Sequence, residues 1–159
     1  MSFRVEDYQD PRVIRAALRE RRVALIGLSA NELRPSNYVG FYLKRHGYEV
    51  LPVNPREQRI LDLPCYPSLL EVPGNVGVVD VFREPAAVPE IARQAVAKGA
   101  RFLWLQFGVI SEEGARIALE GGLRVIVDRC IKIEHARYQG RMHVLGLNTG
   151  VISATRRDM

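Results

Sequence analysis

Five short runs of apolar, mostly β-branched residues alternate along the chain with segments of helical periodicity. These runs are the expected strands, and they cover residues 22–27, 48–53, 76–82, 101–105 and 123–127. A run that is apolar throughout suits a strand that is covered on both faces, as in a parallel sheet. Strands that alternate with helices are joined by right-handed crossovers. The sequence therefore predicts the α/β class, with a single doubly wound Rossmann-type domain around a mostly parallel five-stranded sheet.

The expected helices begin and end at local signals. Asp10-Pro11 starts a short helix, because aspartate caps a helix and proline suits its first turn. Glycine follows the helices expected over 37–46 and 86–98. Ser111 caps a further helix, which ends at Gly121.

Two features of the sequence bear on the edge of the sheet and on where the domain ends. Pro52 has no N–H to donate, so the second strand should lie near an edge of the sheet. Residues 143–152 predict an extra C-terminal strand or hairpin around Asn148-Thr149-Gly150. We therefore expect the domain to cover residues 1–140, with 141–159 as an unassigned C-terminal extension.

The length of 159 residues fits one domain. No apolar run approaches the length of a membrane span, and charged residues near the start interrupt any signal peptide. A cytoplasmic protein with no membrane partner is therefore expected. Cys65 and Cys130 form no Cys-x-x-Cys pair, which argues against a disulfide framework or a metal site.

The net charge of +5 and the isoelectric point of about 9.6 favour an anionic partner. The basic residues are scattered and form no lysine-rich run or basic helix, so no nucleic-acid partner is expected. Most of the cations are arginines, which suit bidentate contacts with phosphate. Arginine richness fits heat adaptation equally well, and the sequence leaves both explanations open.

The loop after the first strand is the first candidate site. Gly27 allows a sharp turn, and Ser29, Arg34 and Ser36 follow it. The helix over 37–46 then offers free N–H groups and a partial positive charge to an anion. The pattern is neither a complete Gly-x-Gly-x-x-Gly motif nor a Walker loop. Two interpretations stay open, a phosphate-binding turn and an ordinary turn capped by Ser36.

Residues just after the other strands should meet this loop, because ligands of doubly wound sheets bind beyond the carboxyl ends of the strands. A dinucleotide site for NAD usually ends the second strand with an acid, whereas this chain has Asn54 there and Arg56 nearby. Arg34 and Arg83 follow other strands and could each hold a phosphate. A ligand with a pyrophosphate and a separate ribose phosphate fits best. NADP and coenzyme A both meet that description.

Several motifs together resemble those of the small stand-alone CoA-binding protein family, in the same order over residues 12–138. They are Gly27-Leu28-Ser29, Arg34-Pro35-Ser36, Pro52-Val53-Asn54-Pro55, Tyr66-Pro67-Ser68-Leu69, Val79-Asp80-Val81-Phe82-Arg83, Trp104-Leu105-Gln106 with Gly108, and Asp128-Arg129-Cys130. The expected fold is also similar to the CoA-binding domain at the start of the succinyl-CoA synthetase alpha subunit.

The resemblance implies that the cofactor is coenzyme A or an acyl-CoA, a small-molecule nucleotide. It implies roles for twelve residues in four groups. The phosphates would lie against Gly27, Leu28, Ser29, Arg34, Pro35 and Ser36, the adenosine ribose against Asn54 and Pro55, the nucleotide against Phe82 and Arg83, and the path toward the pantetheine arm along Gln106 and Gly108. The family has no settled reaction.

A non-catalytic binding or sensor protein is therefore the predicted function. The alternative is an NADP- or acyl-CoA-dependent enzyme that uses Cys130 or His135, although a structural role is expected for both residues. We predict no catalytic or metal-ligating residue. Asp80 lies within a strand and is expected to pair with Arg83 or Arg129. A homodimer contact is compatible with the sequence, but no motif indicates one.

Overall fold

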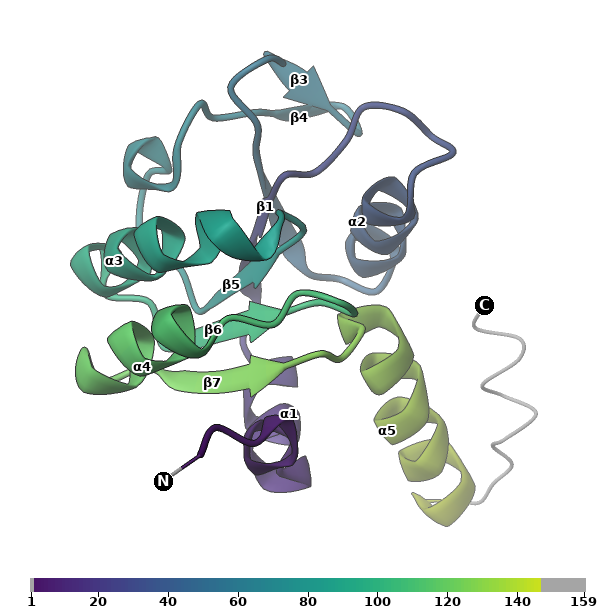
Figure 1. Ribbon diagram of the computed structural model, residues 1–159. Coiled ribbons are helices and arrows are strands. Elements are labelled where there is room, and N and C mark those ends of the chain that lie inside the picture. Colours follow the sequence, from purple (N-terminus) through teal and green to yellow (C-terminus); the bar gives the residue numbers. More distant parts are fainter. Residues whose placement is uncertain (1, 147–159) are drawn as a thin grey trace.

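The fold is built around one parallel sheet (Figure 1). The computed structural model describes residues 2–146, with side chains described to residue 139. The strands in chain order are β1 (Arg22–Ile26), β2 (Glu49–Val53), β5 (Val78–Val81), β6 (Phe102–Leu105) and β7 (Arg124–Val127). They pair in the order β2-β1-β5-β6-β7, and every pair is parallel. The predicted doubly wound α/β fold is confirmed, and Pro52 lies in an edge strand as expected.

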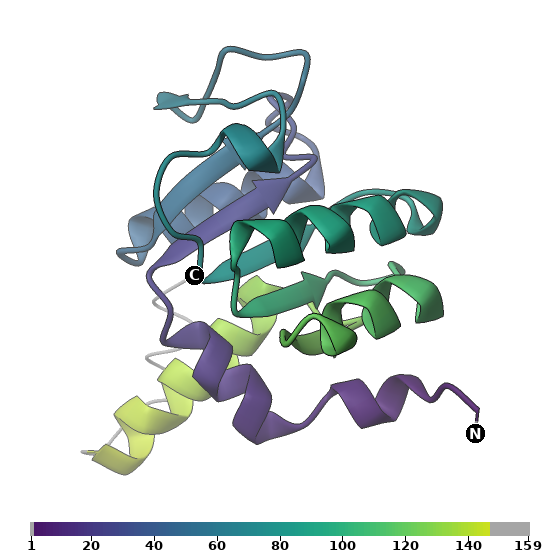
Figure 2. The same ribbon diagram turned by 90° about the vertical axis from the view of Figure 1, so that its left-hand side faces the viewer.

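Helices cover both faces of this sheet (Figures 1 and 2). The helices are α1 (Pro11–Leu18), α2 (Pro35–Arg45), α3 (Val88–Lys98), α4 (Glu112–Glu120) and α5 (Ile131–Gly146). The predicted caps are present: a carboxylate oxygen of Asp10 accepts the N–H of Arg12, and Ser111 Oγ accepts the N–H of Gly114. Short 3-10 turns are η1 (Val5–Tyr8), η2 (Leu69–Glu71) and η3 (Pro85–Ala87).

Successive residues of each strand pack alternately in two hydrophobic cores, one on each face of the sheet. Ala24, Val79 and Leu103 pack in the core beneath α3 and α4. Leu25 and Trp104, both fully buried, pack in the opposite core with α1, α2 and α5. This alternation explains why the strands are apolar throughout, since neither face of the sheet reaches water.

The strand order places a topological switch between β1 and β5. From β1 the chain moves outward to the edge strand β2 and then crosses back to β5 on the other side of β1. The connections after β1 and β5 therefore leave the sheet in opposite directions. A crevice is expected at the carboxyl ends of these two strands.

Two segments differ from the prediction. A small antiparallel hairpin, β3 (Arg59–Ile60) and β4 (Leu63–Pro64), interrupts the region after β2. Residues 143–146 continue α5, so the strand or hairpin predicted to begin at residue 143 is wrong there. The Asn148-Thr149-Gly150 part of that prediction lies outside the described residues. Within residues 2–146, the helices are too short or too polar to span a lipid bilayer.

Candidate functional site

A cleft of about 940 Å³ opens at the switch between β1 and β5. Its walls come from the loop after β1, the loop after β2, the start of η2 and the connection from β5 into α3. Seven of the twelve predicted site residues line it, namely Gly27, Ser29, Arg34, Asn54, Pro55, Phe82 and Arg83. The structure therefore brings together residues from three separate strand ends, as the fold predicts.

Three further predicted residues lie in or next to the loop after β1 but do not line the cleft. Leu28 is fully buried, and Pro35 is the first residue of α2. Ser36 is also buried, and its Oγ accepts the N–H of Ser29 at 3.0 Å. Asn37, the next residue of α2, donates from its side chain to the Ser29 carbonyl at 2.8 Å. The start of α2 thus holds the loop in place through two hydrogen bonds to one residue.

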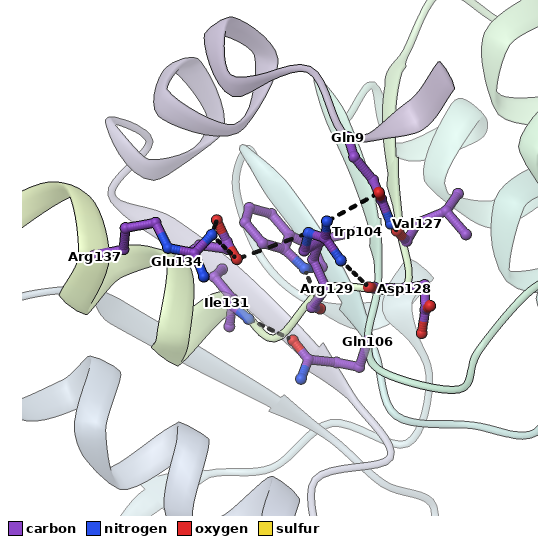
Figure 3. Close-up of polar contacts among 9 residues, drawn as sticks. All are labelled: Gln9, Trp104, Gln106, Val127, Asp128, Arg129, Ile131, Glu134 and Arg137. Carbon is purple, nitrogen blue, oxygen red and sulfur yellow. Dashed lines mark hydrogen bonds and ion pairs between the residues drawn. The ribbon is translucent and has the colours of Figure 1, made fainter. Parts of the chain in front are cut away.

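The last two predicted residues lie beyond β6 and do not line the cleft. Gln106 is buried, and its Oε1 accepts the N–H of Ile131 at 3.0 Å, at the start of α5 (Figure 3). The N–H of Gly108 donates to Asp128 Oδ1 at 2.8 Å. Both residues therefore join β6 to the connection between β7 and α5.

Gly27 directly follows β1 and lies against the residues that follow β5. Its φ of +88° is unfavourable for other residues, and a Cβ there would lie 2.9 Å from the Phe82 carbonyl oxygen. Its N–H donates to the carbonyl of Val53 at 2.9 Å, so the same residue joins the ends of β1 and β2.

We expect Gly27→Ala to destabilise the fold by about 1–3 kcal/mol, because backbone strain and a steric clash coincide there. Gly122→Ala is the matched control, since Gly122 has a φ of +94° but nothing within 4 Å of its Cβ position. Chemical denaturation of both variants measures the difference. Equal losses of stability would show that the contact with Phe82 does not matter.

The loop after β1 uses much of its own hydrogen-bonding capacity. The N–H of Asn31 donates to Ser29 Oγ, and that of Leu33 donates to Asn31 Oδ1. The N–H of Arg34 donates to the Asn31 carbonyl. In this conformation few loop N–H groups remain for an anion. An anion in the cleft would therefore depend mainly on side-chain cations and on the positive end of α2.

Three arginines line the cleft, namely Arg34, Arg56 and Arg83. Arg83 forms a two-pronged pair with Glu84, with Nε–Oε1 at 3.2 Å and Nη2–Oε2 at 3.0 Å. These hydrogen bonds lower the pKa of the Glu84 carboxyl. Among the described residues, no group hydrogen-bonds the guanidinium of Arg34 or Arg56. Exposed ion pairs contribute little stability, so all three guanidinium groups can turn toward a phosphate.

Asn54 links the loop that follows β1 to the loop that follows β2. Its Nδ2 donates to the Leu28 carbonyl at 3.0 Å, and its Oδ1 accepts the N–H of Arg56 at 2.8 Å. The amide therefore fixes the start of the Arg56 segment beside the cleft. No carboxylate occupies the end of β2, although Glu57 also lines the cleft.

Sequence reasoning missed the part of the wall that α3 provides. Glu90, Ile91 and Gln94 line the cleft from one face of this helix. Their helical spacing was the available signal, because Ile91 and Gln94 lie three residues apart. Ser68 and Leu69 complete the opposite wall near η2.

The residues of the alternative enzyme hypothesis lie elsewhere. Cys130 and His135 are both buried, and neither lines the cleft. Tyr42 Oη and His135 Nδ1 share a hydrogen bond of 2.8 Å, which links α2 to α5. Residues 2–139 contain no group of three or more His, Cys, Asp or Glu side chains that could hold a metal ion.

A polar network beyond β7 surrounds the start of α5 (Figure 3). Glu134 is almost fully buried and accepts two hydrogen bonds of 3.1 Å from Arg137 Nη1. Arg129 Nε lies 3.9 Å from the same carboxylate, and Arg129 Nη2 donates to Gln9 Oε1 at 3.0 Å. Trp104 Nε1 donates to the Arg129 carbonyl at 2.8 Å. The network joins the N-terminal segment, the sheet and α5.

The prediction of an arginine partner for Asp80 is wrong. Arg83 pairs with Glu84, while Arg129 contacts Gln9 and Glu134. Asp80 is fully buried in β5, and neither carboxylate oxygen has a hydrogen-bond partner. Burial raises the pKa of this carboxyl well above its ordinary value. Burial without a partner therefore disfavours the ionised form of this side chain.

Comparison with known proteins identifies the family of this chain. The family model described as "CoA binding domain" matches residues 21–136. The uncharacterized protein YneT of Bacillus subtilis is 36% identical over 118 residues, which make up 74% of this chain and 87% of that protein. The ADP-forming acetate–CoA ligase II of Archaeoglobus fulgidus is 33% identical over 98 residues, which are 60% of this chain but 15% of the ligase.

A solved structure extends the agreement to the fold. A hypothetical protein from Pyrococcus horikoshii OT3 superposes with a TM-score of 0.82 at 38% identity, and the match covers 88% of this chain and 99% of that chain. The family match spans most of the sequence, including β1, β5 and the loops that form the cleft. The chain belongs to the CoA binding domain family.

Proposed function

We propose that this protein binds coenzyme A or an acyl-CoA in the cleft between the ends of β1 and β5. The observation that carries the proposal is the meeting of three arginines at the topological switch of a chain from this family. Coenzyme A is strongly anionic, and guanidinium groups match phosphate in both charge and geometry.

Different parts of the ligand would contact different walls of the cleft. Arg34, at the start of α2, and Arg83, beyond β5, would hold the pyrophosphate between them. Phe82 and Ile91 provide apolar contacts for the nucleotide. Arg56 follows Asn54 and Pro55 at the end of β2, where the adenosine ribose is expected, so it would hold the ribose phosphate.

We infer a binding or sensor role rather than a self-contained reaction. The support for this inference is that Cys130 and His135 are buried outside the cleft and bonded within the fold or packed in the core. The chain corresponds to a small part of the acetate–CoA ligase, so the activity of that enzyme is not carried over. A cytoplasmic location and a homodimer both stay predictions.

Calorimetric titration with CoA, dephospho-CoA, NADP and NAD tests the proposal. We expect CoA to bind at least tenfold more tightly than dephospho-CoA, because a hydrogen bond to a charged group contributes roughly 1.5–3 kcal/mol. Arg56→Ala should remove that preference while dephospho-CoA binding stays unchanged. Tight binding of NAD with none of CoA would contradict the assignment.

A further inference from the structure

A second hollow, of about 780 Å³, lies on the other side of the loop that joins β1 to α2. It is bounded by that loop, α2 and the β3–β4 hairpin, which lie near one another in the upper part of Figure 1. Three large apolar side chains line it while exposed to solvent: Leu33 is 81% exposed, Tyr38 59% and Phe41 50%. Contiguous exposed apolar surface of this kind marks a binding surface.

The hollow, which we call the apolar groove, has a fixed shape. Lys44 Nζ donates to the Leu61 carbonyl at 2.8 Å and so ties the hairpin to α2. A Cβ at Gly40 would lie 2.8 Å from Leu61 Cδ1, so the hairpin tip packs directly on the helix backbone. Leu61 and Asp62 adopt positive φ values of 56° and 62°, which define a tight turn. The groove is therefore built by specific contacts of the hairpin.

The groove continues from the cleft. Ala30 lines both hollows, and Arg34 in the cleft lies one helical turn from Tyr38 in the groove. One turn of helix advances about 5.4 Å, which the extended pantetheine arm of CoA can easily span. A ligand whose phosphates lie at Arg34 could therefore place its far end in the groove. This route differs from the one that the resemblance implies along Gln106 and Gly108, which line neither hollow.

The charges of the two hollows differ in a way that fits one amphipathic ligand. The cleft contains Arg34, Arg56 and Arg83, and it would receive the phosphates. The charged residues of the groove cancel, since Glu32 and Asp62 balance Lys44 and Arg59. The groove thus offers no net attraction to an anion, and its apolar side chains suit a hydrocarbon chain.

We propose that the apolar groove binds the acyl chain of an acyl-CoA, so that the preferred ligand carries a medium or long acyl group. This inference rests on the proposed binding of CoA in the cleft. It specifies the ligand class of that site. Tyr38 and Phe41 would then cover the acyl chain.

Calorimetric titration with CoA, acetyl-CoA and octanoyl-CoA tests the inference. We expect octanoyl-CoA to bind at least tenfold more tightly than CoA, because several methylene groups leave water. The variant Tyr38→Gln/Phe41→Gln should bind octanoyl-CoA no more tightly than it binds CoA. Glutamine keeps the helix propensity of these exposed positions, and Leu119→Gln on α4 is a control with a similarly exposed apolar side chain.

Each other outcome has a distinct meaning. Equal binding of CoA and octanoyl-CoA would overturn the groove assignment and leave CoA binding in the cleft intact. A preference for octanoyl-CoA that survives in the double variant would place the chain elsewhere and also overturn it. Absence of binding by every ligand would overturn the proposed function, and the groove assignment with it. Sedimentation that shows a dimer broken by Phe41→Gln, without an acyl preference, would make the groove a self-association surface.

Discussion

Replacement of both Arg34 and Arg83 by alanine is expected to abolish most of the affinity for CoA. The two guanidinium groups face one cleft from α2 and from the end of β5. Each hydrogen bond to a phosphate contributes roughly 1.5–3 kcal/mol, so the pair should account for about 3–6 kcal/mol if the two act independently. The dissociation constant should therefore rise about 150-fold or more.

Calorimetry at a fixed, low ionic strength measures this loss, since salt screens exposed charges. Arg12→Ala/Arg101→Ala removes the same net charge from exposed arginines that pair with Asp10 and Glu20. Neither of these arginines lines the cleft. If that control weakens CoA binding as much as the cleft variant does, overall charge rather than the cleft would explain the affinity, and the assignment would fail.

Asp80→Asn is expected to remove a dependence of stability on pH. Burial raises the pKa of the native carboxyl, whereas the unfolded chain ionises at the ordinary value near 3.8. Above that value the native state holds one proton more than the unfolded state, so stability falls as the pH rises toward the native pKa. The slope approaches about 1.4 kcal/mol per pH unit within that window.

Urea denaturation at pH 5 and pH 7 tests this sign and size. The wild type should lose stability relative to Asp80→Asn as the pH rises from 5 to 7, by no more than about 1.4 kcal/mol per pH unit. Asparagine has nearly the same shape and cannot ionise, although its amide stays buried without a partner. Asp7→Asn, on the exposed η1 turn, should follow the wild type. Parallel pH profiles for wild type and Asp80→Asn would show that this carboxyl is solvated.

The sequence predicted the sheet well because each strand carries its own signal. Apolar runs, the caps at Asp10 and Ser111, and the edge position of Pro52 all reflect local chemistry. The β3–β4 hairpin was missed because each of its strands has only two residues. A pattern of period two cannot be recognised over that length.

The candidate site was predicted in part for a different reason. Gly27 and Arg83 follow the two strands that flank the switch, Asn54 follows the neighbouring edge strand β2, and these residues share the cleft. Gln106 follows β6, which lies one strand beyond the switch, and its side chain meets the start of α5. Adjacency to a strand end was visible in the sequence, but the order of the strands was not. The wrong prediction for Asp80 has the same cause, because the sequence did not show that Arg83 pairs with Glu84 and that Arg129 lies near Glu134.

The cleft and the polar network that anchors α5 lie at different halves of the sheet. The cleft takes its walls from the β1, β2 and β5 ends and from α3, whereas the network of Trp104, Arg129 and Glu134 secures the other half. Substitutions at Arg34, Arg56 or Ser68 change the wall of the cleft without touching the residues that anchor α5. If the proposed binding holds, ligand preference can diverge among related chains while the contacts that anchor α5 are kept.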